Sequence, residues 1–190
     1  MQKLGLVEFV SVDGVMQGLA GPEAGFPYGG WGNDYPLVFP DGSATGPTSE
    51  TTAYLFGRRT YEDMSAFWPS QPDDNPMAAH LNATRKYVVS ATLTDTSWDP
   101  TTIIRDEVVA SVSALKRQGD GAIVVLGSGQ LARTLLAADL VDTVTLFIHP
   151  LLLGTGAALF GDLPQQRRLR LESHAVSELG TLVLTYAFVS

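Results

Sequence analysis

The chain has 190 residues, of which 45% are hydrophobic and 17% are charged, a composition typical of a globular domain with one sizeable core. Its formal net charge of −8 and pI of about 4.7 argue against a nucleic acid partner, because binding a phosphate backbone requires clustered Lys and Arg over a whole face. The chain has no cysteine, which excludes disulfides, a thiolate nucleophile and zinc sites built on cysteine.

The N-terminal residues contain neither the apolar core of a signal peptide nor a small-residue cleavage site. No run approaches the ~20 apolar residues of a membrane span. We therefore expect a cytoplasmic protein without a membrane segment, folded as a single domain over residues 1–190.

The first predicted strand, residues 4–12, ends at the turn sequence Asp13-Gly14. Residues 14–47 that follow are rich in glycine, proline and aromatic residues. A loop of this length inside a compact domain is usually functional or disordered, and the aromatic residues argue against disorder. We interpret it as an active-site lid or substrate wall; the alternative is an arm that packs in a dimer or is domain-swapped.

Strands and helices alternate through the middle of the chain. Strands are predicted over residues 53–56, 86–91, 102–104 and 122–126, and helices over residues 60–67, 106–118 and 130–138. The chain closes on strands at 143–148, 169–176 and 181–189, the last two joined by a hairpin at 177–180. This order predicts an α/β layered sandwich with a mixed sheet.

A glycine turn opens the helix at 130–138. The sequence Gly127-Ser128-Gly129-Gln130-Leu131-Ala132 follows a buried strand, so backbone N–H groups and the positive helix end can face an anion. It also matches the dinucleotide pattern G-x-G-x-x-A, but the acidic residue that a Rossmann site needs after the next strand is replaced by His149-Pro150. The alternative is a turn made only for close packing.

A second strand-to-helix junction carries two guanidinium groups and a hydroxyl, in the sequence Gly57-Arg58-Arg59-Thr60. These groups suit phosphate oxygens, although Arg58 and Arg59 could instead pair with Glu62 and Asp63. Two such junctions in one domain favour a ligand with at least two phosphate groups.

Several segments, spread along nearly the whole chain in the order of the family, resemble the dihydrofolate reductase-like family of riboflavin-biosynthesis reductase domains, especially its small free-standing bacterial members. The matching segments are residues 11–14, 55–62 (Leu-Phe-Gly-Arg-Arg-Thr-Tyr-Glu), 86–90, the glycine turn with 135–136, 140–142 and 150–160 (Pro-Leu-Leu-Leu-Gly-Thr-Gly-Ala-Ala-Leu-Phe). The resemblance implies a dihydrofolate reductase-like three-layer α/β sandwich, whose central sheet is mixed and mainly parallel with antiparallel C-terminal strands.

The resemblance also implies NADPH as cofactor, with Arg58 at the 2′-phosphate, Arg59 and Thr60 at the pyrophosphate, and Ser90 at the adenosine end. The glycine turn would line the pyrophosphate and the nicotinamide ribose, through Leu126, Gly127, Ser128, Gly129, Gln130 and Leu131. Asp13 would serve the substrate as proton donor or orienting group, and Gly14 and Trp31 would lie beside the substrate. Trp31 could stack on a flat heterocycle, or simply pack in the core or lid.

The implied reaction is an NADPH-dependent reduction resembling that of 5-amino-6-(5-phosphoribosylamino)uracil reductase in riboflavin biosynthesis, on a small heterocyclic or ribosylamino substrate. Two alternatives stay open. One is a dihydrofolate or pteridine reductase, for which Asp41 and Glu50 are poor matches to the pterin-binding acid; the other is a cofactor-binding protein without turnover, since the turn reads Leu-Gly-Ser-Gly where the riboflavin enzymes show Glu-Gly-Gly.

The three histidines, His80, His149 and His174, have no metal-ligand spacing, so no metal is expected and each is read as a satisfied or surface side chain. The apolar residues of the last strand predict a homodimer. They are Leu182, Leu184, Tyr186 and Phe188.

Overall fold

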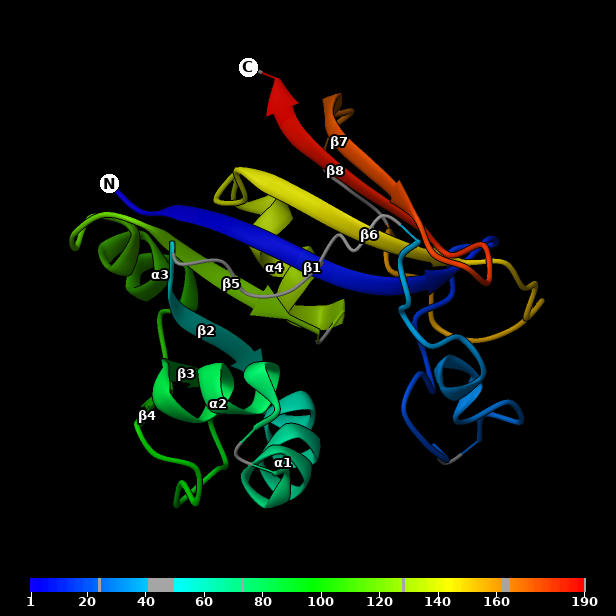
Figure 1. The fold of residues 1–190 in the computed structure, drawn as a ribbon. Coiled ribbons are helices and arrows are strands. Elements are labelled where there is room, and N and C mark those ends of the chain that lie inside the picture. The colour runs from blue at the N-terminus through cyan, green and yellow to red at the C-terminus, as the bar shows by residue number, and fades with distance from the viewer. Residues whose placement is uncertain (24, 41–49, 73, 128, 162–164, 190) are drawn as a thin grey trace. The chain divides into compact units, whose positions relative to one another are not determined.

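The computed structural model describes residues 1–23, 25–40, 50–72, 74–127, 129–161 and 165–189. Its strands form one eight-stranded sheet in the order β4-β3-β2-β5-β1-β6-β8-β7. Figure 1 labels these strands and the helices. β2, β3, β4 and β5 pair in parallel, and β6, β8 and β7 pair antiparallel. The predicted mixed sheet with antiparallel C-terminal strands is therefore confirmed.

The described strands and helices have the following bounds. The strands are β1 (Lys3–Ser11), β2 (Thr51–Gly57), β3 (Arg85–Val89), β4 (Thr101–Ile104), β5 (Ala122–Leu126), β6 (Thr143–His149), β7 (Arg168–Val176) and β8 (Leu182–Val189). The helices are α1 (Arg58–Phe67), α2 (Pro76–Ala83), α3 (Val108–Lys116) and α4 (Gly129–Ala137), with 3-10 turns η1 (Trp31–Asp34) and η2 (Trp68–Ser70).

The chain divides into two compact units, each made of two chain segments. The first unit comprises Met1–Leu6 and Thr45–Val141, and the second comprises Val7–Ala44 and Asp142–Ser190. The first unit holds the parallel strands β2 to β5 with helices α1 to α4, and the second holds β6, β7 and β8 with the described part of the Gly-rich segment.

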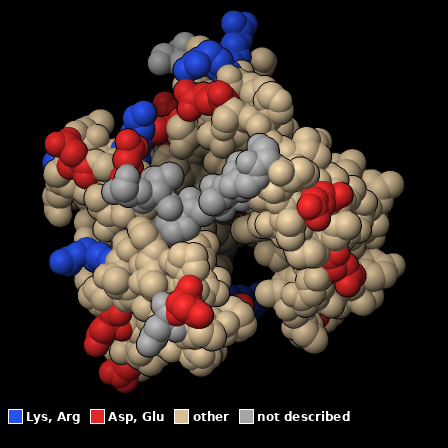
Figure 2. All heavy atoms as spheres, in the orientation of Figure 1, with Lys and Arg blue, Asp and Glu red and all other residues tan. Residues whose placement is uncertain are grey.

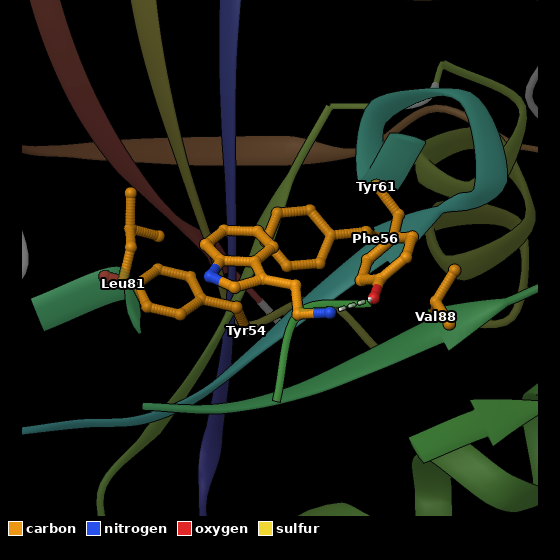
Figure 3. Close-up of a cluster of buried hydrophobic side chains, with 6 residues drawn as sticks. Tyr54, Phe56, Tyr61, Leu81 and Val88 are labelled. Carbon is orange, nitrogen blue, oxygen red and sulfur yellow. Dashed lines mark hydrogen bonds between the residues drawn. The ribbon is translucent and has the colours of Figure 1, made fainter. Parts of the chain in front are cut away.

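In the first unit, β2 is buried along most of its length, as its continuous apolar sequence predicts. Tyr54 and Phe56 of β2 pack in an aromatic core with Tyr61 of α1 (Figure 3). The backbone N–H of Trp98 donates a hydrogen bond of 3.2 Å to the Tyr61 hydroxyl. Because Leu81 of α2 joins the same core, α1 and α2 cover one face of β2.

The structure differs from the sequence prediction in its helix and strand ends. α1 begins at Arg58, two residues before the predicted start, and β3 ends at Val89, two residues before the predicted end. α2 was not predicted. It begins with Asn75 as N-cap, whose side-chain oxygen accepts hydrogen bonds from the N–H groups of Met77 and Ala78 at 3.0 and 3.2 Å, and with a proline in its first turn.

In the second unit, β7 and β8 form the predicted hairpin, closed by a 2.9 Å hydrogen bond from the N–H of Ser177 to the carbonyl of Thr181. The described part of the Gly-rich segment packs against the rest of the unit. Val15, Phe26 and Trp31 form a buried cluster, and Leu19, Leu151 and Leu153 surround it. Residue 24 and residues 41–47 of the predicted loop lie outside the described residues.

Acidic and basic side chains are interspersed on the face drawn in Figure 2, and the described residues there form no continuous basic surface. None of the helices in the described ranges is long and apolar enough to cross a membrane.

Candidate nucleotide site and substrate loop

Three neighbouring parallel strands of the first unit end at the same edge of the sheet. Gly57, the last residue of β2, aligns with Val89, the last residue of β3, and Leu55 of β2 aligns with Val125 of β5. The residues that follow these strands, among them Arg58, Ser90 and Gly127, therefore lie along one edge.

This edge contains a topological switch point. β3 and β5 lie on opposite sides of β2. After β2 the chain continues to β3 on one side, and after β5 it continues through α4 to β6, which lies in the opposite direction along the sheet. In open α/β sheets, ligands bind beyond the carboxyl ends of the two strands at such a point. The topology places the candidate site beyond the ends of β2 and β5.

The two strand-to-helix junctions at this point touch each other. Gly127 has a φ of +62°, and a Cβ on it would lie 3.0 Å from both Cγ2 and Oγ1 of Thr60. A side chain at Gly127 would thus be strained by its backbone and crowded by Thr60. Glycine brings the β5–α4 turn against the first turn of α1.

Arg58 is held in an ion pair within α1. Its Nη1 donates hydrogen bonds to Oε1 and Oε2 of Glu62 at 3.0 and 3.2 Å, the pairing that the sequence had left as an alternative. Both side chains are close to half-exposed, and exposed pairs of this kind contribute only ~0.2–1 kcal/mol. An incoming phosphate could therefore replace Glu62.

The other predicted cofactor residues differ in their exposure and in their hydrogen bonds. The Ser90 hydroxyl oxygen accepts hydrogen bonds from the N–H groups of Thr92 and Leu93 at 3.2 and 2.9 Å, so it already stabilises a turn. Leu131 is buried. Arg59 and Gln130 are exposed, Leu126 is half-buried, Gly129 is the first residue of α4, and Ser128 lies outside the described residues.

Asp13 belongs to the second unit, where it fixes the loop after β6. Its carboxylate accepts hydrogen bonds from the Ser11 hydroxyl at 2.6 Å and from the N–H groups of Gly154 and Leu153 at 2.7 and 3.2 Å. These hydrogen bonds, that of Ser11 first, lower the pKa of Asp13 from 3.8 to about 2. Asp13 is thus a carboxylate at neutral pH.

Gly14 and Trp31 have structural contacts of their own. Gly14 turns the chain with a φ of +80° and donates its N–H to the carbonyl of Ser11. Trp31 is 5% exposed, and its Nε1 donates a 2.7 Å hydrogen bond to the carbonyl of Gln17. Its ring therefore packs inside the second unit and presents no open face in this conformation.

The roles of two polar residues went unrecognised in the sequence. Ser11 is buried and holds Asp13; its spacing in Ser-x-Asp-Gly is the signal that could have identified it. His149, read as satisfied or superficial, is buried with its Nε2 unpartnered among the described residues. Within those residues, no cluster of His, Asp and Glu could hold a metal ion.

Comparison with known proteins gives a consistent result. The family model of the RibD C-terminal domain matches residues 2–184. The uncharacterised protein YyaP of Bacillus subtilis (strain 168) is 25% identical over 180 residues, which cover 93% of this chain and 90% of YyaP. YwjB of the same organism, also uncharacterised, is 25% identical over 118 residues, which cover 62% of this chain and 63% of YwjB.

Solved structures share the fold at low sequence identity. A protein of Shewanella sp. PV-4 named for riboflavin biosynthesis aligns over 100% of both chains with a TM-score of 0.74 and 20% identity. A pyrimidine reductase-like protein of Corynebacterium diphtheriae covers 100% of this chain with 92% of its own length, at a TM-score of 0.58 and 13% identity.

Dihydrofolate reductase of Enterococcus faecalis, solved with NADP(H), covers 99% of this chain with 97% of its own length, at a TM-score of 0.60 and 14% identity. The fold is therefore that of dihydrofolate reductase. With a family model that matches nearly its whole length, the chain belongs to the RibD C-terminal domain family.

Proposed function

We propose that the chain is an NADPH-dependent reductase that transfers a hydride to a small heterocyclic or ribosylamino substrate. The observation that carries this proposal is the contact between Gly127 and Thr60 at the switch point of the sheet. It puts a backbone turn that favours glycine beside a helix start with two arginines, a combination suited to a dinucleotide with several phosphate groups.

The residues at this edge fit NADPH. In our proposal the pyrophosphate is bound by backbone N–H groups of the glycine turn and by Arg59 and Thr60, while Arg58 exchanges Glu62 for the 2′-phosphate. Leu126, Gln130 and Leu131 would line the nicotinamide ribose, and Ser90 the adenosine end. The cofactor supplies the hydride when bound; the protein supplies binding and orientation.

Asp13 is assigned to the substrate side as an orienting carboxylate. With a pKa of about 2 it carries no proton to donate at neutral pH, which favours orientation over the proton-donor role. Its charge and its hold on Leu153 and Gly154 would shape the loop that faces the substrate. Gly14 allows this turn, and Trp31 contributes by anchoring the Gly-rich wall.

The names of the structural relatives support an aminopyrimidine precursor of riboflavin as the substrate class. A pteridine substrate is less favoured. Of the two acids considered for pterin binding, Glu50 is exposed and Asp41 lies outside the described residues. A cofactor-binding protein without turnover is the second candidate, since Leu126 stands where the riboflavin enzymes carry Glu.

The test follows the absorbance of NADPH in the purified protein mixed with a panel of ribosylaminopyrimidines, pterins, flavin precursors and nitro compounds. We expect protein-dependent oxidation of NADPH with one class, abolished or strongly reduced in Gly127→Ala. Tight NADPH binding without oxidation under any substrate would support the non-enzymatic alternative. Failure to bind NADPH would refute both.

A further inference from the structure

His149, the last residue of β6, is a buried imidazole whose two nitrogens have different surroundings. Its side chain is 2% exposed. Nδ1 lies 3.1 Å from the hydroxyl oxygen of Thr181, which is itself fully buried. Nε2 is buried and has no hydrogen-bond partner among the described residues. A buried nitrogen without a hydrogen bond lowers the stability of the fold, so its presence here needs a physical explanation.

Aromatic rings cover this imidazole. The ring centroids of Trp31 and Tyr35, from the Gly-rich segment, lie 5.3 and 5.4 Å from that of His149. Phe9 of β1 stacks on it from another side at 6.1 Å. The segment is also tied at Val38, whose carbonyl accepts a 2.8 Å hydrogen bond from the N–H of Glu178. His149 is therefore the polar centre on which the segment packs.

No carboxylate compensates a charge on His149 within the described part of the chain. Tyr35 is the one titratable group whose ring contacts it there. Asp34 on the segment and Glu178 in the hairpin are exposed, and Glu8 precedes Phe9 in β1, so its side chain points to the opposite face of the strand. An imidazolium would have neither water nor an anion, and burial accordingly lowers the pKa of His149 below 6.5.

We propose that His149 is a positioning residue for the Gly-rich segment: its neutral imidazole holds Trp31 and Tyr35 in place, and its protonation releases them. In the released state the imidazolium reaches water and regains its ordinary proton affinity. The inference rests on packing within the second unit alone, and goes beyond the proposed reductase activity without depending on it.

The test is amide hydrogen exchange of the unliganded protein between pH 7.5 and 5.0, corrected for the intrinsic exchange rates. The reporters are the N–H groups of Gly30 and Gly32, which donate to the carbonyls of Gly18 and Leu19. Because burial lowers the pKa of His149 in the packed state, the opening constant should rise as the pH falls, by at most about thirtyfold over this range, the limit set by a released state that titrates near 6.5. Equal corrected exchange at both ends of the range would overturn the proposal.

His149→Phe keeps a ring but removes the titrating group, so exchange of Gly30 and Gly32 should become independent of pH. His174→Phe, on the exposed β7 strand, is the matched control and should behave as wild type. Persistence of the pH effect in His149→Phe would also overturn the proposal.

A direct reading on the wild type avoids dependence on a variant that fails to fold. Nuclear magnetic resonance should show His149 titrating below its ordinary value, with the Trp31 indole N–H signal shifting at the same midpoint as the imidazole. Titration of His149 at its ordinary value, with the Trp31 signal unchanged, would contradict the inference.

Discussion

Asp13 controls a loop that lies far along the chain. Its carboxylate binds the N–H groups of Leu153 and Gly154, residues separated from it in sequence by 140 and 141 positions. An amide at this position keeps one acceptor oxygen but turns an N–H donor toward another donor. The residue therefore links the first turn of the chain to the loop that we assign to the substrate.

We predict that Asp13→Asn keeps the affinity for NADPH and lowers turnover by roughly tenfold or more, because small misplacement of orienting groups is costly to catalysis. Steady-state kinetics and cofactor titration measure the two effects. Asp34→Asn, at an exposed position of the same unit, is the control. Equal losses of binding and turnover would mean that Asp13 is a structural turn residue.

The lowered pKa of Asp13 also predicts how the stability of the fold depends on pH. Since the folded-state pKa is lowered from 3.8 to about 2, the hydrogen-bonded carboxylate adds stability that is complete above about pH 4 and is lost as the pH falls towards 2. Wild type should lose more stability than Asp13→Asn over that interval in denaturant unfolding. Parallel curves for the two proteins would show that the hydrogen bonds of Asp13 add nothing to folding.

Arg58 tests the 2′-phosphate assignment. Charge-assisted hydrogen bonds contribute about 1.5–3 kcal/mol, or roughly ten- to a hundredfold in affinity. Arg58→Ala should lose that much for NADPH and little for NADH, and the preference should shrink in salt because the site is exposed. Nicotinamide fluorescence titration measures both cofactors.

Arg170→Ala provides the matched control, since Arg170 also pairs with a glutamate on the surface, at 3.1 Å from Glu172. It should leave both affinities unchanged. If wild type binds NADPH and NADH equally, or Arg58→Ala weakens both alike, the assignment of Arg58 is wrong.

At the scale of elements, the turn between β5 and α4 is the part of the candidate site that depends most on a single residue, Gly127. Gly127→Ala would place an L-residue in the left-handed region, at a cost of ~1–2 kcal/mol, and would press on Thr60. We expect lower thermal stability and weaker binding of NADPH and NADH alike, in contrast to Arg58→Ala.

Gly25→Ala separates strain from crowding, because Gly25 has a φ of +80° with no atom within 4 Å of the added Cβ. It should lower thermal stability by a similar amount and leave cofactor affinity intact. Thr60→Ser in the Gly127→Ala background should recover part of the binding. Unchanged cofactor affinity in Gly127→Ala would remove the glycine turn from the site.

The alternation of strands and helices could be predicted because buried parallel strands have continuous apolar sequences, as at residues 122–126. α2 was missed because its helix signals are local and polar: an Asn75 cap, a proline and a short run with little amphipathic pattern. The ends of α1 and β3 were misplaced by two residues because caps and turns, not apolar periodicity, decide them.

The candidate site was predictable in part. The glycine turn and Arg58-Arg59-Thr60 are local patterns, and the resemblance supplied their roles. The pairing of Arg58 with Glu62 is also local, since the two lie one turn apart in α1. The contact of Gly127 with Thr60 and the burial of His149 depend instead on which elements become neighbours. The apolar periodicity of a single sequence predicts the elements but not which of them pack against one another.

For the whole molecule, the outer strands predict self-association. β7 is an edge strand, and its cross-strand pairs with β8 set apolar side chains on one face. Leu169, Leu171, Val176 and Leu182 are each about 40–50% exposed, next to the partly buried Leu184, Tyr186 and Phe188. Exposed apolar faces and unpaired edges favour association.

We therefore predict a homodimer that uses this face, and that Leu171→Lys makes the protein monomeric. Light scattering at micromolar concentration measures the mass. Leu152→Lys is the control, because Leu152 is the more exposed leucine, at 74%, and lies outside β7 and β8. A monomeric wild type would refute the prediction, and a dimeric Leu171→Lys would move the interface elsewhere.

The central claim is that NADPH binds beyond the ends of β2 and β5, and a crystal structure of the protein with NADPH tests it most directly. The account predicts the pyrophosphate against the Gly127 turn and Thr60, and the 2′-phosphate within hydrogen-bond distance of Arg58, with Glu62 displaced. NADPH bound at another edge of the sheet, or with its 2′-phosphate away from Arg58, would contradict it.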